Sequence, residues 1–183
     1  LGVALNIILV VAILGYFGVE TTSFAALVVG LGLAIGAAWS GLLANFAAGA
    51  FLIIFRPYKV GDYVLAGTVE GTVTEIGLFN TTITSPDNVA VIVGNSKVSG
   101  EVIRNYSAFP YRRVERTAQL AFGVDPLDAI ALLKPALAAI PNVVAVPAPD
   151  VEILDFNALG TVLAVRPYCH TDHYWQVYFD TNR

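Results

Sequence analysis

The sequence predicts a membrane α-helical segment followed by a small β-barrel or β-sandwich domain and an α+β domain. Of its 183 residues, 56% are hydrophobic and 13% are charged, whereas ordinary soluble domains carry about 25% charged residues. The apolar excess lies in residues 1–55, where Glu20 is the only charged side chain. We therefore expect lipid to solvate this part, and the strand and helix patterns after it to form globular domains.

Two apolar runs make up the predicted membrane part. Residues 1–19 are interrupted only by Asn6 and are long enough for a transmembrane helix. Because this run starts in the middle of apolar sequence and the chain contains no methionine, we expect the helix to be truncated at its start. A polar turn at residues 20–23 follows, in which Thr22 or Ser23 is placed to cap the next helix.

The second run, residues 24–56, is predicted to be a helix with a break. A straight helix of roughly 32 residues would measure about 48 Å, whereas the hydrocarbon core of a bilayer is about 30 Å thick. Gly41 and Gly49 are the expected hinges of this helix. Arg56 and Lys59 are the first basic residues of the chain, so the positive-inside rule places everything after them in the cytoplasm.

Small residues occupy two faces of this second helix on a helical wheel. One face consists of Ala26, Gly30, Ala34 and Ala38, and the other of Gly32 and Gly36. A helix that pairs with one neighbour needs one small face, whereas two small faces suit a ring of identical helices. In a ring, Leu33, which lies between the faces, points at the axis, and Ala37 continues the lining one turn later. The pattern favours an α-helical pore segment, and simple pairing stays open as the alternative.

An apolar constriction at Leu33 and Ala37 would act as a gate. A narrow hydrophobic neck blocks ions by dewetting, without a plug. Contacts between glycine and alanine surfaces also let helices slide, because few side chains interlock. The pore would therefore widen when the ring expands.

Residues 60–110 are predicted to form a cytoplasmic β domain. Valine and isoleucine residues separated by glycine-containing turns indicate short strands, and residues 89–93 follow a Ser-Pro-Asp-Asn turn. This spacing is typical of a small barrel or sandwich.

Residues 111–183 are predicted to form an incomplete cytoplasmic α+β domain. The candidate strands are residues 114–122, 151–156 and 161–168. Asp125 and Pro126 fit the N-cap and first position of a helix that runs to about Ile140, with Pro135 expected to kink or shorten it. A further helix is expected near Asp172.

Motifs along the chain resemble the bacterial mechanosensitive channel of small conductance family. Besides the Gly/Ala-rich helix, they are Val19–Ser23, Asn45–Gly49, Phe55–Val64, Gly71–Val73, Phe79–Thr82 and Arg104–Ser107. The resemblance extends over nearly all of the chain and is specific, because the motifs keep their order with few gaps.

The resemblance implies a mechanosensitive ion channel that opens under membrane tension and releases ions and small solutes on hypo-osmotic shock. It implies a homoheptamer in the bacterial inner membrane, multi-pass and surrounded by membrane lipid, with a hollow cytoplasmic vestibule. In that family the pore helix bends at a glycine that matches Gly41, and two leucine rings match Leu33 and Ala37. Alanine at position 37 implies a wider gate or one that depends on Leu33 alone. Val29 replaces a packing glycine, which implies stiffer sliding, and Gly94-Asn95 replaces Pro-Asn.

A metal site is not expected near the C-terminus. The segment from Cys169 to His173 contains metal-capable side chains, but no HExxH or paired CxxC motif accompanies them. An N-cap role for Thr171 or Asp172 at a strand-to-helix junction explains the segment better. No cofactor is expected either, because no nucleotide-binding motif occurs.

The remaining polar residues favour structural roles. Arg112, Arg113 and Arg116 form a basic cluster that suits a solvated strand or a subunit contact better than nucleic acid, since the net charge is −4. Asn45, the one amide of the second helix, is either a satisfied interhelical contact or a polar point at the bend. No arrangement of side chains suggests an enzyme. The alternative to a channel is a membrane-anchored cytoplasmic binding or scaffold domain without a pore, which would need no small faces.

Overall fold

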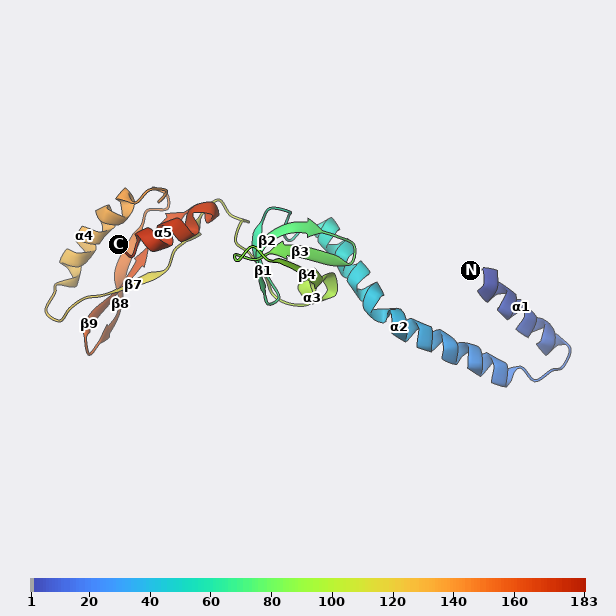
Figure 1. Cartoon of the computed structure of the whole chain (residues 1–183). Coiled ribbons are helices and arrows are strands. Elements are labelled where there is room, and N and C mark those ends of the chain that lie inside the picture. The colour runs from blue at the N-terminus through green and yellow to red at the C-terminus, as the bar shows by residue number, and fades with distance from the viewer. Residues whose placement is uncertain (1) are drawn as a thin grey trace.

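Two N-terminal helices, a sheet domain and an α+β unit follow one another along an elongated molecule (Figure 1). The computed structural model describes residues 2–183. Leu1, the first residue of the predicted N-terminal helix, lies outside the described residues. The membrane-type helix and the two globular units therefore occur in the order that the sequence predicts.

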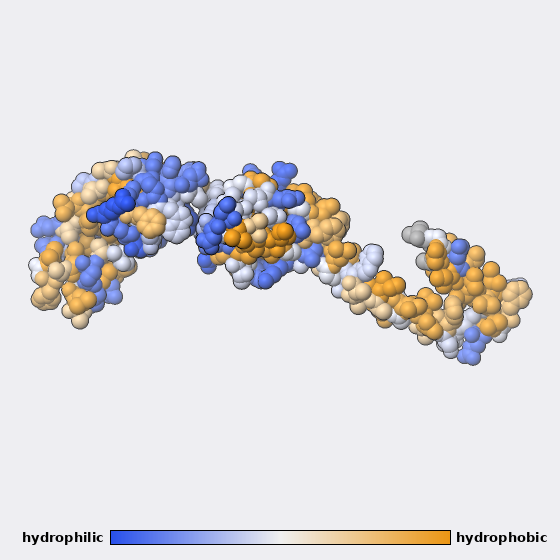
Figure 2. Space-filling view, viewed as in Figure 1, coloured by the Kyte–Doolittle hydropathy of each residue, from blue (hydrophilic) through white to orange (hydrophobic). Residues whose placement is uncertain are grey.

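The helices α1 (Gly2–Tyr16) and α2 (Thr22–Phe55) carry the apolar sequence, and both are largely hydrophobic on the visible surface (Figure 2). Within residues 2–183, α2 alone is long and apolar enough to cross a membrane. The fifteen residues of α1 span about 22 Å at 1.5 Å per residue. The capping prediction was wrong by one residue, because Thr21 is the N-cap of α2 and its side chain makes no capping hydrogen bond.

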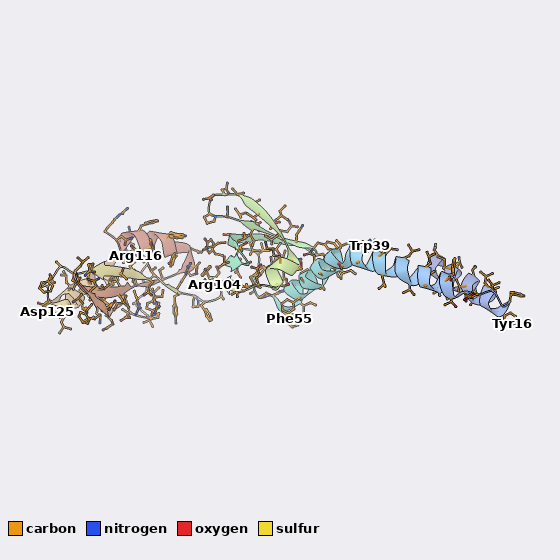
Figure 3. All side chains as sticks on the ribbon, turned by 90° about the horizontal axis from the view of Figure 1, so that it is seen from below. Tyr16, Trp39, Phe55, Arg104, Arg116 and Asp125 are labelled. Atoms are coloured by element: carbon orange, nitrogen blue, oxygen red, sulfur yellow. The ribbon has the colours of Figure 1, made fainter. Side chains whose placement is uncertain are left out.

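The predicted break in the second helix is absent. α2 is continuous from Thr22 to Phe55, although its ribbon changes direction near Trp39 (Figure 3). Glycine keeps its backbone N–H group and so preserves the helical hydrogen bonds, whereas proline, which removes them, first occurs at Pro57. α2 therefore curves instead of breaking.

The β domain is one five-stranded antiparallel sheet in the order β4-β3-β2-β1-β5. Its strands are β1 (Tyr63–Ala66), β2 (Val69–Ile76), β3 (Asn80–Thr84), β4 (Ala90–Gly94) and β5 (Ile103–Asn105). A register shift between Val73 and Glu75 marks a bulge in β2. The short helix α3 (Asn95–Ser99), which the sequence does not predict, follows β4 directly.

Buried apolar side chains of the sheet domain and of the last turns of α2 form one core. The fully buried members come from α2, the loop after it, the strands and α3, and include Leu52, Tyr58, Val64, Val73, Ile83 and Val98. Because Leu52 belongs to α2, the last turns of the membrane-type helix are part of the core of the sheet domain.

The C-terminal unit combines a three-stranded antiparallel sheet, in the order β7-β9-β8, with α4. Its elements are β6 (Arg112–Arg113), β7 (Arg116–Gln119), α4 (Pro126–Ala139), β8 (Asp150–Asn157), β9 (Gly160–Arg166), β10 (Tyr168–Cys169), the 3-10 turn η1 (Thr171–His173) and α5 (Tyr174–Asp180). The strand β10 pairs with β6 in a separate two-stranded sheet.

Local signals in this unit are confirmed in most places. Asp125 caps α4 by accepting a hydrogen bond from the Leu127 N–H group at 2.8 Å, and Pro126 is the first helical residue. The helix continues past Pro135 to Ala139, so the proline does not end it. At the last helix the predicted cap was wrong: His170, not Thr171 or Asp172, is the N-cap of η1, and its side chain accepts from the Asp172 N–H group.

Candidate pore-lining helix

The first two thirds of α2 make few contacts within the chain. Every residue from Thr22 to Ala44 is exposed, and Leu33, the predicted constriction, is 71% exposed. Ala37 is exposed as well. The fold of one chain therefore leaves both residues free to face something outside it.

No contact within the chain requires glycine on this part of α2. A methyl group added at Gly30, Gly32, Gly36 or Gly41 would meet no heavy atom within 4 Å. Each glycine in a helix interior costs about 1 kcal/mol relative to alanine. The glycines of the small faces therefore lower the stability of the helix, and no contact within a single chain offsets this loss.

Gly49, the second predicted hinge, has a different environment. It is buried, and a methyl group there would lie 2.1 Å from the Leu78 carbonyl oxygen and 2.5 Å from Nδ2 of Asn95. Close approach of the sheet domain thus explains this glycine. The hinge role of Gly41 stays a prediction, and its setting in open space is compatible with it.

Val29, the bulky interruption of the small faces, borders α1. Together with Ala25 and Val28 it lines a shallow apolar hollow whose other wall is Ile7, Ile8 and Val11 of α1. Its side chain accordingly packs toward the preceding helix of the same chain. The predicted stiffening of helix sliding by Val29 is not tested by this contact.

Polar side chains near the change of direction bond to the helix backbone. The Ser40 hydroxyl donates to the Ala37 carbonyl at 2.8 Å, and Nδ2 of Asn45 donates to the Gly41 carbonyl at 3.0 Å. Side-chain bonds of this kind and Ser-Gly pairs are recognised causes of helix bending. The curvature of α2 therefore has an identifiable origin at residues 40–45.

Asn45 joins α2 to the sheet domain. Its Oδ1 atom accepts hydrogen bonds from the Ser96 N–H group at 2.9 Å and from the Ser96 hydroxyl at 2.8 Å. Gly94 lies so close that a methyl group on it would be 2.7 Å from the same oxygen. Asn45 therefore makes a satisfied contact between two helices, α2 and α3 of the same chain, and its bond to Gly41 lies at the curved part of α2.

A buried polar chain lies behind this contact. Tyr58 and Thr81 share a hydrogen bond of 3.3 Å, Thr81 donates to Oδ1 of Asn95 at 2.8 Å, and Nδ2 of Asn95 donates to the Gly77 carbonyl at 2.9 Å. Burial raises the pKa of Tyr58, whereas its bond to Thr81 has a smaller opposing effect. The sequence gives little sign of this network, since Thr81 and Asn95 look like ordinary turn or strand residues there.

Two of the three arginines of the cluster have polar partners in the same unit. The Arg113 guanidinium pairs with Glu115 at 2.9 Å, and Arg116 donates to the Tyr178 hydroxyl at 2.6 Å and to Oδ1 of Asn182 at 2.8 Å. These contacts fit the structural role predicted for the cluster.

No three His, Cys, Asp or Glu side chains converge on a common point among residues 2–183. Cys169 is buried, and burial raises the pKa of its thiol, while the nearby Arg112 lowers it to a smaller extent.

Comparisons with known proteins identify similar chains. The family described as mechanosensitive ion channel, β-domain, matches residues 41–108. The small-conductance mechanosensitive channel of Edwardsiella ictaluri is 35% identical over 150 residues, which are 81% of this chain and 52% of that protein. An uncharacterized MscS family protein of Buchnera aphidicola subsp. Schizaphis graminum is 44% identical over 124 residues, covering 68% of this chain and 44% of its own length. The chain thus spans about half the length of these relatives.

Solved structures of two channels share the fold. The closed state of Helicobacter pylori MscS superposes with a TM-score of 0.87 at 24% identity and covers 98% of this chain and 72% of that one. Arabidopsis thaliana MSL1 gives a TM-score of 0.75 at 25% identity, over 98% of this chain and 69% of that one. The arrangement of α1, α2, the sheet domain and the α+β unit is therefore shared with these proteins.

Proposed function

This chain belongs to the MscS family of mechanosensitive channels, and on that premise we propose that it is the pore-and-vestibule part of a homo-oligomeric channel gated by membrane tension. In this proposal, opening releases ions and small solutes on hypo-osmotic shock. The protein would be a multi-pass heptamer of the bacterial inner membrane, with its C-terminal domains in the cytoplasm.

The observation that carries the proposal is the surface of α2. Four glycines there leave open space around them within the chain, at a cost of about 1 kcal/mol each relative to alanine. Contacts with identical helices on both sides would use that space, since small residues let helix backbones approach closely in lipid. A membrane-anchored scaffold, the other candidate, needs only an apolar helix and gives no reason for the glycines.

We assign the constriction to Leu33 and Ala37 and the helix contacts to the small faces. The residues of those faces are Ala26, Gly30, Gly32, Ala34, Gly36 and Ala38. Leu33 lies between the faces, so its exposed side chain would point at the axis of the ring. Gly41, beside the curved part of α2, is the proposed hinge.

Substitution of Leu33 by serine tests the gate. A hydroxyl in the neck favours wetting, so Leu33→Ser is expected to open at lower tension, or to leak at rest, in patch-clamp recordings from membranes that hold the full-length protein. Leu31→Ser is the matched control, because Leu31 is an exposed leucine that lies about 200° around the same helix from Leu33.

An unchanged opening tension in Leu33→Ser would count against the gate. Equal effects of the two serine variants would show that position on the helix does not matter, which contradicts the ring. A protein that is monomeric in detergent and carries no current in liposomes would favour the scaffold.

A further inference from the structure

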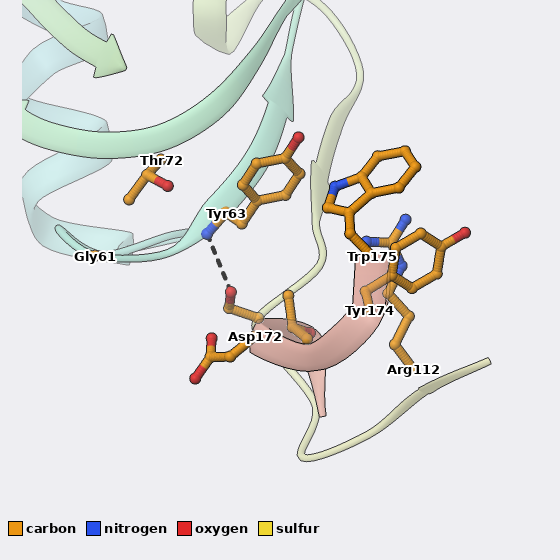
Figure 4. Close-up of a pocket in the computed structure, with 9 residues that line it drawn as sticks. Gly61, Tyr63, Thr72, Arg112, Asp172, Tyr174 and Trp175 are labelled. Carbon is orange, nitrogen blue, oxygen red and sulfur yellow. Dashed lines mark hydrogen bonds between the residues drawn. The ribbon is translucent and has the colours of Figure 1, made fainter. Parts of the chain in front are cut away.

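A cavity lies between the sheet domain and the α+β unit (Figure 4). Its volume is about 330 Å³, and its lining comes from three parts of the chain. The sheet domain contributes Gly61, Tyr63 and Thr72, the connecting segment contributes Ser107, and the α+β unit contributes Arg112, Thr171, Asp172, Tyr174 and Trp175. Small-molecule sites are common at such junctions between units, and this volume is at the lower end of their range.

Arg112 is held in the cavity wall by two aromatic rings. Its guanidinium carbon lies 4.1 Å from the centroid of the Tyr106 ring and 3.7 Å from that of the Tyr174 ring. Ring contacts use the faces of a guanidinium and leave its N–H groups, which point outward in its plane, free for hydrogen bonds. Within residues 2–183, no side chain or carbonyl accepts a hydrogen bond from the guanidinium of Arg112, in contrast to those of Arg113 and Arg116.

Tyr63 supplies a second group without a partner. Its hydroxyl is buried and makes no hydrogen bond to any described residue, and an unsatisfied buried hydroxyl calls for an explanation. Burial, with a further contribution from the Glu70 carboxylate, raises the pKa of Tyr63 to about 12. The phenol therefore keeps its proton at neutral pH, but its buried oxygen is not open to a ligand in the cavity.

Some of the other polar groups of the wall are already engaged. The Thr171 hydroxyl donates to the Tyr106 carbonyl at 2.6 Å, and the Ser107 hydroxyl accepts from the Tyr63 N–H group at 3.0 Å. The carboxylate of Asp172 is 3.2 Å from Nδ1 of His170, and its side chain is 78% exposed, so water screens its charge. Arg112 is the only cation among the residues that line the cavity.

We propose that this cavity binds a small oxyanion, a compound with one carboxylate or phosphate group, through the N–H groups of Arg112. A planar guanidinium matches both kinds of group by paired hydrogen bonds. The exposed ring of Trp175 would cover the remainder of the compound. Because both units form the wall, the bound anion would also hold them in one relative orientation. The proposal does not depend on the channel function.

The test uses the full-length protein in detergent with every tryptophan except Trp175 replaced by phenylalanine. Trp175 lines the cavity, so its fluorescence reports on occupancy. Inorganic phosphate and acetate are titrated separately at constant ionic strength, and sodium chloride serves as the control for screening. We expect a saturable change with at least one of the two oxyanions and none with chloride, and the pair distinguishes phosphate from carboxylate recognition.

Matched variants then locate the site. Arg112→Gln is expected to weaken binding by roughly 10- to 100-fold, as for the loss of a hydrogen bond to a charged group, whereas Arg113→Gln is expected to bind like the parent. Should Arg112→Gln fail to fold, Arg112→Lys decides, and it is expected to bind more weakly because lysine cannot form the paired hydrogen bonds of a guanidinium. The absence of saturable binding in the parent would overturn the proposal, and so would parent-like affinity in Arg112→Gln, or in Arg112→Lys where that variant takes its place.

Discussion

Gly49→Ala is expected to destabilise the joint between α2 and the sheet domain. The added methyl group would lie 2.1 Å from the Leu78 carbonyl oxygen and 2.5 Å from Nδ2 of Asn95, so either α2 or the β2–β3 connection must move by about 1 Å to restore van der Waals distance. Leu52 and Asn45, which lie one turn away on either side, would shift with it. The contacts at risk are therefore the buried Leu52 side chain and the two hydrogen bonds to Ser96.

The magnitude follows from two opposing effects. Overpacking against backbone atoms costs about 3 kcal/mol, and the better helix propensity of alanine offsets about 1 kcal/mol. The expected net loss is about 2 kcal/mol, which lowers the melting temperature by about 4–8 °C for a chain of this size.

Thermal unfolding of the full-length protein in detergent, at one scan rate, measures this loss. Gly41→Ala is the matched control, because it makes the same exchange in the same helix, outside the two small faces and with nothing within 4 Å inside the chain. If Gly49→Ala melted at the same temperature as Gly41→Ala, the close approach of α2 to the Leu78 carbonyl would be refuted.

Two further predictions concern polar groups. Asn45→Ala removes the acceptor of both Ser96 hydrogen bonds, so hydrogen exchange at the Ser96 amide is expected to accelerate by roughly 10-fold or more, for a loss of about 1.5 kcal/mol; exchange as slow as in the parent would contradict the contact. The pKa of Tyr63 is raised to about 12 from an ordinary value of 10.0. The folded state therefore has its full stability from the protonated Tyr63 side chain below pH 10, and this contribution is lost as the pH rises toward 12. Denaturant titrations at pH 9 to 12 are expected to show this decline and a weaker one in Tyr63→Phe; identical profiles would contradict it.

Elements with local signals were predictable from the sequence. The Asp125-Pro126 pair marked the start of α4 because capping depends on adjacent residues, and the apolar run marked α2 because lipid solvation requires composition alone. The short helix α3 was missed because its five residues carry no periodic pattern. Its position depends on Ser96 bonding to Asn45 and on the burial of Val98, contacts between residues far apart in sequence.

The glycines show where sequence reasoning about the site reaches its limit. Gly41 and Gly49 looked alike as hinges, since a glycine in an apolar helix serves flexibility and close approach equally well. Only the positions of Leu78 and Asn95 distinguish them. The same holds for Arg112, which belongs to a sequence cluster with Arg113 and Arg116 but whose ring contacts come from Tyr106 and Tyr174.

The curvature of α2 falls at the boundary between its two kinds of surface. Residues of α2 before Asn45 are exposed, whereas Gly49 and Leu52 are buried against the sheet domain. The two backbone-directed hydrogen bonds, from Ser40 to Ala37 and from Asn45 to Gly41, lie between these parts. Because Asn45 uses its amide nitrogen on α2 and its oxygen on α3, a change of curvature at Gly41 alters the geometry of the joint as well. We therefore expect a force on the N-terminal part of α2 to act on the sheet domain through this side chain as well as through the backbone of α2.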